Sequence, residues 1–277
     1  MLLKRERVEC KNGDTAELFL LKAPLEEYLE RVLSLTSESM PWARDNLKRA
    51  AGETEQECDN YYFYAEMRGV PASLMWYTEK CGVATYGLVY TKEEFRGLGL
   101  VNLLMRRCCG HMAQNGVKSA YLAVSNQVAM AIYQGFEFAV INGNEQCSIM
   151  RRDFSETADY FTYDREALIR RVRRSDLPLL EALYNVRDSR VKDENMLIYQ
   201  DTAVECQLIE MINRAEAGEG SFYCLQTHKG SIVGGATRLG DKISCYVYPL
   251  FEKWREPLTD AVRNSEGKEN ESGTDRQ

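Results

Sequence analysis

The residues most suited to bind a ligand form a short turn, Arg96-Gly97-Leu98-Gly99, between a β-prone segment and an amphipathic helix. Two glycines allow a tight turn and let the backbone come close to a ligand. The N–H groups at the start of the helix favour a phosphate group, helped by the helix dipole. Arg96 can add a charge-assisted contact. The turn is therefore a candidate cradle for a pyrophosphate, with a purely structural turn as the alternative.

The turn differs from the two commonest nucleotide-binding loops. A P-loop ends in Gly-Lys-Ser or Gly-Lys-Thr, and the sequence contains neither tripeptide. A dinucleotide-binding loop needs a third glycine three residues after the second, where this chain has Asn102. The motif must therefore be interpreted together with the residues that follow it.

Those residues have the pattern of a helix, a strand and a second helix. Apolar side chains recur on one face of the first helix, at Leu100, Leu103, Leu104, Cys108, His111 and Met112. Asn115-Gly116 is typical of a helix end, and residues 117–124 are β-prone. Asn126 follows with a side chain that is suited to cap the second helix.

Two stretches of this segment resemble the GNAT N-acetyltransferase superfamily. The acetyl-CoA signature of that family, Arg/Gln-x-x-Gly-x-Gly/Ala, matches Arg96 and Gly99, with Val101 at the last small position. A second family pattern, Asn-x-x-Ala-x-x-Leu/Ile-Tyr followed by Gly-Phe, matches Asn126, Ala129, Ile132, Tyr133, Gly135 and Phe136. Only Gln134 separates Tyr133 from Gly135, a shorter spacing than is usual in the family. The resemblance covers about residues 10–152.

The resemblance implies an acyltransferase that moves an acetyl group from acetyl-CoA to a primary amine by direct attack, without a metal. It implies that CoA lies between the strands that end near Thr91 and Val124. The thioester carbonyl would accept hydrogen bonds from backbone N–H groups near residues 89–91. The implied cofactor-binding residues are Val89, Tyr90, Thr91, Arg96, Gly97, Leu98, Gly99, Leu100, Val101, Asn126 and Tyr133.

The resemblance also implies that Tyr133 is the general acid for the departing thiolate, because a phenol pKa of about 10 exceeds a thiol pKa of about 8.5. The alternatives are a core aromatic for Tyr133 and a simple helix cap for Asn126. Glu66 and Glu79 are the two candidate bases in or near the central strands. The sequence does not distinguish between small amines, amino acids, peptide N-termini and lysine as the acceptor.

Composition favours a cytoplasmic enzyme with reduced thiols. Nine cysteines occur without a Cys-x-x-Cys pair, which argues against a disulfide framework or a zinc site. A net charge of −7 argues against a nucleic-acid partner. No apolar run approaches the roughly 20 residues of a membrane helix, so no membrane partner is expected. The expected partners are acetyl-CoA and an amine acceptor, and a homodimer is left open.

The hydrophobic pattern predicts an α/β (α+β) fold with a mixed, mostly antiparallel central sheet flanked by helices, the acyl-CoA N-acyltransferase fold that the resemblance implies. The predicted strands are residues 16–21, 61–67, 72–77, 83–90, 117–124, 136–141 and 147–151. Helices are predicted at 25–35 and 41–51, in addition to the two that follow the glycine turn.

The second half of the chain repeats the first part of this pattern. Its predicted elements are a strand at 168–172, helices at 176–186 and 204–215, and strands at 221–227, 231–238 and 242–248. No Gly-x-Gly follows the last strand, and the arginines of 165–174 are expected to face solvent. The half-sheet would leave an edge and a face that another part of the protein must cover.

The predicted domains are therefore a GNAT-like catalytic domain (1–153), a linker (154–165), a partial GNAT-like domain without a CoA site (166–255) and a disordered tail (256–277). A different class of function stays open on the same fold. The protein could be a non-catalytic acyl-CoA-binding or interaction protein, since Val101 and the short spacing after Tyr133 depart from the family pattern.

Overall fold

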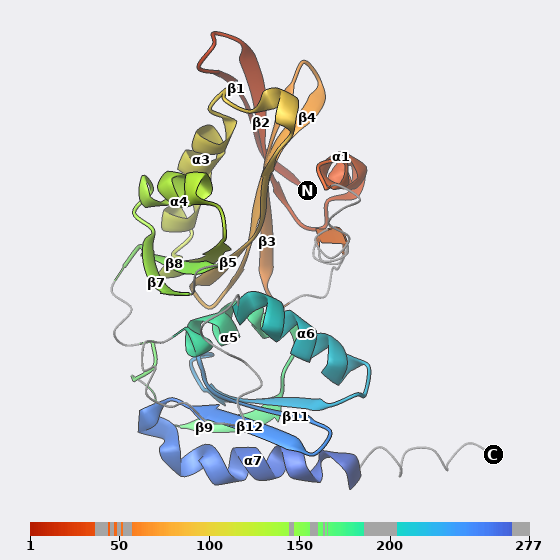
Figure 1. Ribbon diagram of the computed structural model, residues 1–277, viewed down its shortest axis with the longest axis vertical. Helices are drawn as coiled ribbons and strands as arrows, with labels where there is room; N and C mark the ends of the chain where they lie inside the picture. Colours follow the sequence, from red (N-terminus) through yellow and green to blue (C-terminus); the bar gives the residue numbers. More distant parts are fainter. Residues whose placement is uncertain are drawn as a thin grey trace, which may run out of the picture. The chain divides into compact units, whose positions relative to one another are not determined.

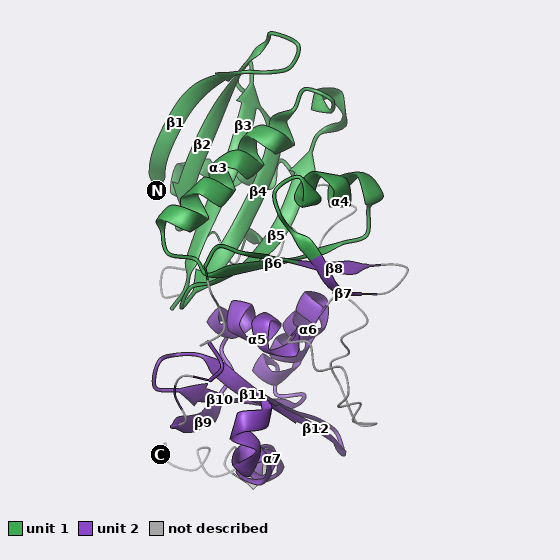
Figure 2. Ribbon diagram, turned by 90° about the vertical axis from the view of Figure 1, so that its left-hand side faces the viewer, with its two compact units in different colours: residues 1–139, 151–155 green, residues 140–150, 156–277 purple. Residues whose placement is uncertain are grey.

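The computed structural model describes residues 1–36, 44, 47–48, 51, 57–143, 147–155, 160–162, 164, 166–185 and 204–267. The chain is shown from N- to C-terminus in Figure 1. It divides into two compact units, which Figure 2 colours separately. Unit 1 contains residues 1–139 and 151–155, and unit 2 contains residues 140–150 and 156–277. Each unit is described here by itself.

The larger sheet has eight strands in the order β1-β2-β3-β4-β5-β6-β8-β7, and its strands β1 to β6 lie wholly in unit 1. The strands are β1 (Leu2–Glu9), β2 (Thr15–Lys22), β3 (Asp59–Met67), β4 (Val70–Lys80), β5 (Val83–Thr91), β6 (Ser119–Val124), β7 (Ala139–Gly143) and β8 (Ser148–Asp153). Neighbours from β1 to β5 pair antiparallel, and β5 pairs parallel with β6. The predicted mixed, mostly antiparallel sheet is confirmed.

Helices cover both faces of this sheet (Figure 1). The helical elements of unit 1 that the structure describes over their whole length are the 3-10 turns η1 (Glu26–Tyr28) and η2 (Glu93–Phe95), and the α-helices α1 (Leu29–Leu33), α3 (Leu100–Gln114) and α4 (Gln127–Gln134). Figure 1 shows α1 on one face, and α3 and α4 on the other. The predicted helix at 25–35 therefore forms as η1 followed by α1, and most of the predicted helix at 41–51 lies outside the described residues.

The aromatic sequence of β3 follows from burial on both faces. Tyr62 and Tyr64 belong to the core cluster that also contains Val32 and Leu33 of α1. Tyr61 and Phe63 point to the other face, where their rings contact His111 of α3 at centroid distances of 4.6 and 5.6 Å. Successive side chains alternate between faces, so a strand that is covered on both sides can carry apolar residues at successive positions, as residues 61–65 do.

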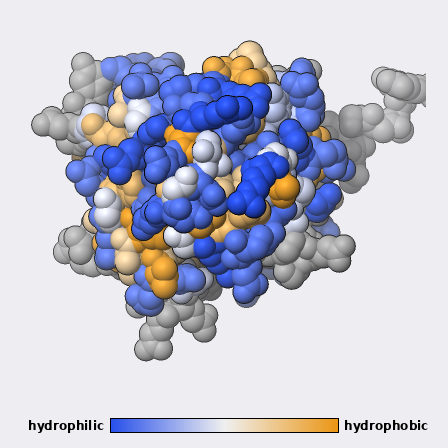
Figure 3. Space-filling model, turned by 90° about the horizontal axis from the view of Figure 1, so that it is seen from above, coloured by the Kyte–Doolittle hydropathy of each residue, from blue (hydrophilic) through white to orange (hydrophobic). Residues whose placement is uncertain are grey.

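The first strand was missed by the sequence pattern. β1 (Leu2–Glu9) is an edge strand that pairs antiparallel with β2, and five of its eight residues are charged. Charged side chains on an edge strand limit pairing with other chains, and they also remove the alternation by which strands are recognised. The part of the surface that is visible in Figure 3 is correspondingly mainly hydrophilic, with smaller hydrophobic patches.

Unit 2 has a four-stranded antiparallel sheet with the order β12-β11-β10-β9. Its elements are β9 (Ala167–Arg171), η3 (Arg174–Asp176), α5 (Leu177–Tyr184), α6 (Val204–Glu216), β10 (Ser221–Thr227), β11 (Ile232–Leu239), β12 (Lys242–Val247), η4 (Pro249–Trp254), α7 (Arg255–Arg263) and η5 (Asn264–Gly267). The order strand, two helices, three strands agrees with the prediction. Strands that follow one another in the chain are neighbours in this sheet, as they are in the part β2-β3-β4-β5 of the sheet in unit 1.

The predicted disordered tail at 256–277 is wrong for its first part, because α7 occupies Arg255–Arg263. Leu258 and Val262 of α7 are buried in a core cluster with Val233 and Val247. The helix therefore covers a face of the half-sheet that the sequence prediction left open. The missed signal is the apolar stripe Trp254, Leu258, Val262, whose spacing of four places it on one helical face among charged residues.

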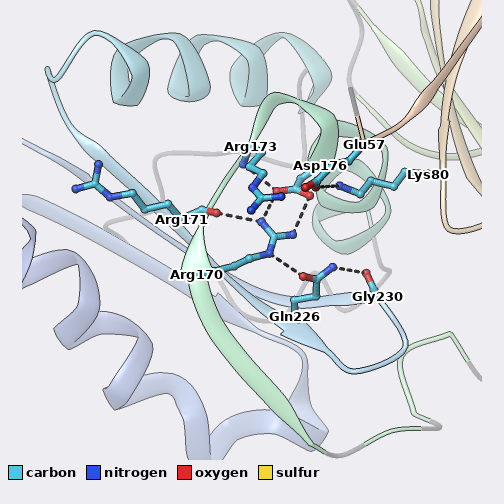
Figure 4. A network of polar contacts seen from close by, with 8 residues as sticks. All are labelled: Glu57, Lys80, Arg170, Arg171, Arg173, Asp176, Gln226 and Gly230. Atoms are coloured by element: carbon cyan, nitrogen blue, oxygen red, sulfur yellow. Dashed lines mark hydrogen bonds and ion pairs between the residues drawn. The ribbon is translucent and has the colours of Figure 1, made fainter. Parts of the chain in front are cut away.

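Arg170 also departs from the prediction that the arginines of 165–174 face solvent. Its guanidinium binds the fully buried Asp176 through two hydrogen bonds of 2.7 and 2.9 Å (Figure 4). Its Nε donates to Gln226 Oε1 at 2.7 Å, and Gln226 donates to the carbonyl of Gly230 at 3.1 Å. This network joins β9, η3 and the turn between β10 and β11, so Arg170 is part of the interior of unit 2.

We predict that Arg170→Met lowers the free energy of unfolding of the full chain by about 3–5 kcal/mol, because it leaves the buried carboxylate of Asp176 without its guanidinium. Arg263→Met is the matched control, since Arg263 pairs with Asp260 where both side chains are about half exposed (57% and 48%). That variant should change stability by less than about 1 kcal/mol. Urea unfolding measures both, and equal effects would contradict the structural role of Arg170.

Candidate active site

The glycine turn joins the end of β5 to the start of α3. After Thr91 the chain forms η2 and then Arg96-Gly97-Leu98-Gly99, and α3 begins at Leu100. Gly97 and Gly99 have φ angles of 80° and 82°, a left-handed conformation that favours glycine. Arg96 Nε donates to the carbonyl oxygen of Thr91 at 3.3 Å. The turn therefore folds the arginine back toward the end of β5.

The N-terminus of α3 carries uncompensated positive charge. Its N-cap is Gly99, which offers no capping side chain, and no acidic residue lies in the first turn. The first N–H groups of a helix have no partner within the helix, and the dipole adds partial positive charge at the same place. Such a terminus is suited to bind an anion.

β5, the strand that leads to this helix terminus, is paired with β6 over only part of its length. Their parallel pairing runs only from Val83 to Thr85 on β5, opposite Ser119 to Tyr121 on β6, although β5 continues to Thr91. On the other side, β5 stays paired with β4 up to Thr91. The backbone of β5 beyond Thr85 therefore has a paired edge toward β4 and, in the described pairing, an unpaired edge toward β6.

The backbone groups of β5 that face this unpaired edge can be identified from its neighbours. Lys92 N–H donates to the carbonyl of Ala72, and the Tyr90 carbonyl accepts from Ser73 Oγ, so these residues face β4. Backbone direction alternates along an antiparallel pair. Val89 and Thr91 therefore direct their N–H groups toward the β6 side, within the range where the family resemblance places the thioester carbonyl.

A bulge marks the middle of β5. The register with β4 shifts between Met75 and Tyr77, which leaves one additional residue of β5 at Gly87-Leu88. The indole of Trp76 lies over Gly87, since a Cβ on Gly87 would be 2.0 Å from Trp76 Cε2. Tyr62 stacks against the same indole with ring centroids 5.5 Å apart. Gly87 is thus required because an aromatic ring approaches its backbone.

A groove of about 730 Å³ runs between α3 and α4. Its lining residues are Asn102, Arg106, Gln127, Val128, Ala131, Ile132, Gly135 and Phe136. Asn102 belongs to the first turn of α3, so the groove begins beside the N-terminus of that helix. Val128 of this groove is 72% exposed. Sequence reasoning missed this groove, although the spacing 102/106 and 127/131 places its residues on single helical faces.

Tyr133 combines a buried ring with a hydroxyl that makes no hydrogen bond to the described part of the chain. The residue is 6% exposed, and its ring packs edge-on against Phe138 at a centroid distance of 6.2 Å. Burial raises the pKa of Tyr133 to about 12. The phenol is therefore protonated across the neutral range, as a proton donor must be.

Asn126 is the N-cap of α4. Its Oδ1 accepts from the backbone N–H groups of Val128 at 2.8 Å and Ala129 at 3.3 Å. The helix-cap alternative is therefore observed. The amide Nδ2 of the same side chain is not used by the cap and is the atom with which Asn126 could also contact a ligand.

The two candidate bases lie in different environments. Glu66 is buried on β3, where it accepts a hydrogen bond from Tyr64 at 3.1 Å and pairs with Arg31 at 3.2 Å. Glu79 accepts from the backbone N–H of Gly82 at 2.6 Å, and burial raises its pKa. Because Glu79 pairs with Ala84, it lies at the opposite end of β5 from Thr91. The structure does not bring Glu79 together with the glycine turn.

Two contributors to the turn have no local sequence signal. Lys11, in the hairpin between β1 and β2, donates its backbone N–H to the carbonyl of Leu98 at 3.2 Å. Ser73 on β4 shares a 2.8 Å hydroxyl–hydroxyl hydrogen bond with Thr91. Both residues reach the turn only through sheet pairing, which local patterns do not reveal.

No helix of the described residues is long and apolar enough to cross a membrane. The described residues also contain no group of three or more His, Cys, Asp or Glu that could hold a metal ion. All nine cysteines are free thiols.

We predict that Gly87→Ala lowers the free energy of unfolding by about 1–3 kcal/mol, because the new Cβ overlaps the Trp76 indole. Gly110→Ala is the matched control, since a Cβ at Gly110 in α3 meets nothing within 4 Å. That change should stabilise the chain by up to about 1 kcal/mol through helix propensity. Thermal and urea unfolding should show changes of opposite sign in the free energy of unfolding of the two variants. Changes of the same sign would contradict the close approach of the Trp76 ring to Gly87.

The comparisons with known proteins concern this same unit. Residues 29–138 match the model of the acetyltransferase (GNAT) family. Similar solved structures include the GNAT domain of S. lividans PAT, with 12% identity over 54% of this chain and 96% of that chain (TM-score 0.44). They also include the ribosomal-protein-S18-alanine N-acetyltransferase from Escherichia coli, with 20% identity over 50% of this chain and 97% of that one (TM-score 0.41).

A third similar structure is the PaiA N-acetyltransferase from Thermoplasma acidophilum in complex with coenzyme A, with 15% identity over 48% of this chain and 98% of that one (TM-score 0.39). The comparison with curated proteins found no match. The family model covers the helix terminus, the parting strands and Tyr133. Residues 29–138 are therefore similar to the acetyltransferase (GNAT) family, and this match supports acyl transfer in general.

Proposed function

We propose that unit 1 transfers an acetyl group from acetyl-CoA to a primary amine by direct attack of the amine on the thioester. The observation that carries this proposal is the uncapped N-terminus of α3, which follows two left-handed glycines after the end of β5. Beyond Thr85, the edge of β5 toward β6 is unpaired in the described pairing. An anion site and an unpaired strand edge that adjoin one another suit a donor that has a pyrophosphate at one end and an amide-containing arm at the other.

The donor would be held by backbone groups more than by side chains. The N–H groups of residues 98–101 would bind the pyrophosphate, with Arg96 beside it. The pantetheine arm would follow the unpaired edge of β5, with Asn126 near it. The groove between α3 and α4 is large enough for part of the nucleotide, and Val128 offers an apolar surface to a base there.

Acyl transfer then requires three events at the thioester. The carbonyl oxygen must be stabilised as it becomes negative, which we assign to the N–H groups of Val89 and Thr91. The amine nitrogen forms a bond to the carbonyl carbon and loses a proton, and the carbon–sulfur bond breaks to release a thiolate. Tyr133 would give its proton to that thiolate.

The pKa of Tyr133 decides whether this last step is favourable. A phenol with a pKa of about 12 is a weak donor toward a thiolate whose pKa in water is about 8.5. Apolar surroundings raise the pKa of a thiol as well, so a thiolate released beside the buried ring would be more basic than in water. Proton transfer therefore depends on both groups sharing one dry environment.

The acceptor amine must arrive without its proton. An α-amino group, with a pKa of about 7.7–8.0, is partly unprotonated at neutral pH, whereas a lysine amine at about 10.4 is not. Glu66 is better placed than Glu79 to accept a proton through water, because it lies at the same end of the sheet as Thr91. Its carboxylate is already bound by Arg31 and Tyr64. These contacts favour an acceptor that needs little help from a base.

The same contacts favour a second candidate function, a non-catalytic acyl-CoA-binding protein. Glu66 is held in an ion pair, and Glu79 is bound by the backbone of its own turn. Release of free CoA from acetyl-CoA in the presence of an amine panel separates the two functions. An enzyme would release free CoA with at least one class of amine. A binding protein would bind CoA but release none from acetyl-CoA with any amine.

We also propose that unit 2 is a partial copy of the same fold without a CoA site of its own. After β12 the chain continues through η4 into α7, whose N-cap is Trp254, where unit 1 has a glycine turn and α3. A cytoplasmic location remains part of the proposal.

We predict that Gly99→Glu weakens CoA binding at least tenfold, because a side chain blocks the approach of the phosphates and adds a carboxylate beside them. Gly116→Glu is the matched control at the other end of α3, with a similar left-handed φ of 75° and no atom within 4 Å of a Cβ. It carries the same charge and similar backbone strain. Calorimetry with CoA measures both folded variants, and equal affinities would remove the proposed site.

We predict that Tyr133→Phe lowers kcat by about 100-fold while CoA affinity changes little, since the ring remains and only the proton donor is lost. Because the pKa of Tyr133 is about 12, its deprotonation should not reduce the wild-type rate below about pH 11. Tyr86→Phe, which removes a buried hydroxyl beside Cys108, is the control. Undiminished kcat in Tyr133→Phe under chemistry-limited conditions would assign the residue to the core alone.

A further inference from the structure

Lys11 lies across the glycine turn, although it comes from the hairpin between β1 and β2. Its backbone N–H donates to the carbonyl of Leu98 at 3.2 Å. Its Cγ, Cδ and Cε atoms lie 3.1, 3.3 and 3.2 Å from the point that a Cβ on Gly99 would occupy. Three successive carbons at nearly equal distance mean that the stem lies flat over Gly99. The ammonium group, one bond farther, is thereby held beside the N-cap of α3.

This position is electrostatically unfavourable for a cation when no anion is present. Helix N-termini repel cations and attract anions, and α3 has no acidic residue in its first turn. Among the described residues, Lys11 has no ion-pair partner. Asp14 of the same hairpin interacts instead with Asn12 at 3.0 Å and with Arg68 at 3.6 Å.

The backbone that carries this exposed side chain is fixed by the fold. The hairpin that carries Lys11 is closed by two backbone hydrogen bonds, from Cys10 to Asp14 at 2.7 Å and from Gly13 to Cys10 at 3.0 Å. Arg96 adds a second cation at the turn through its contact with the Thr91 carbonyl. Lys11, Arg96 and the helix terminus thus all belong to the glycine turn or contact it, in a chain whose net charge is −7. Such convergence indicates an anion that completes the site.

We propose that the ammonium group of Lys11 binds the pyrophosphate of CoA from the side of the β1–β2 hairpin, with Arg96 as the other cation at the turn. This inference rests on the proposed function and adds a side-chain determinant of donor affinity to it. Lys11 makes no contact with the reacting atoms in this arrangement. It therefore sets the affinity for acetyl-CoA and leaves the chemical step unchanged.

The test uses the full chain, with CoA and 3′-dephospho-CoA as calorimetric probes at two salt concentrations. Lys11→Met keeps the stem over Gly99 and removes the charge, and Lys11→Arg keeps the charge. Lys118→Met is the matched control, because the Lys118 stem covers another left-handed glycine, Gly82, with its Cγ 3.3 Å from a Cβ there. Gly82 lies in the turn that precedes β5, at the opposite end of that strand from the glycine turn.

Lys11→Met should bind both probes about tenfold more weakly than the wild type, with a shallower dependence on salt. Lys11→Arg and Lys118→Met should bind both probes like the wild type. With an amine that the wild-type chain acetylates, the KM for acetyl-CoA should rise in Lys11→Met while kcat is retained.

Unchanged affinity of Lys11→Met for both probes would overturn the inference and leave the proposed function intact. Loss of affinity for CoA alone, with 3′-dephospho-CoA unaffected, would overturn it too, since the contact would then be with the 3′-phosphate. A wild-type chain that binds neither probe would overturn the proposed function and this inference together.

Discussion

The candidate site depends on the positive N-terminus of α3 and on how the chain leaves it open. A long helix normally has a polar side chain at its N-cap or a carboxylate in its first turn. Here Gly99 takes the N-cap position, and its left-handed conformation turns the chain from η2 into the helix without a capping group. The N–H groups and the dipole remain available to an external anion. The glycines thus determine both the path of the chain and the charge of the site.

The central sheet supplies the second half of the site because β5 has different neighbours on its two edges. On the β4 side it is paired to its end, and on the β6 side the pairing stops at Thr85. The bulge at Gly87-Leu88, where Trp76 covers the glycine, lies just beyond that point. Because β5 is anchored by β4, its other edge can hold backbone donors in place without a protein partner. Unit 2 lacks this arrangement, since β12 is followed by a helix that covers the face of the sheet.

Sequence reasoning identified the parts of the fold whose signals are local. The glycine turn, the helix after it and the Asn126 cap are each specified within a few residues, and the structure places them as expected. β1 and α7 were missed because their apolar positions are sparse among charges. The roles of Lys11 and Arg170 could not be predicted, because their contacts are made with residues distant in the sequence. Such contacts exist only after the strands have paired.

Tyr133 shows how burial connects the fold to the proposed chemistry. The same packing against Phe138 that makes the ring part of the core also raises the pKa of the phenol to about 12. A more exposed tyrosine would be a stronger acid, but it would face a thiolate stabilised by water. In a site without water, the pKa values of the Tyr133 phenol and of the CoA thiol both rise. The difference between these two pKa values would therefore depend on how completely the bound donor excludes water. In the proposed complex, the groove between α3 and α4 and the cations at the glycine turn would hold the nucleotide end of the donor, away from the reacting thioester. Their contribution to the proposed chemical step would therefore be indirect: they would fix the position of the thioester, and the burial of Tyr133 would then decide whether its proton is transferred.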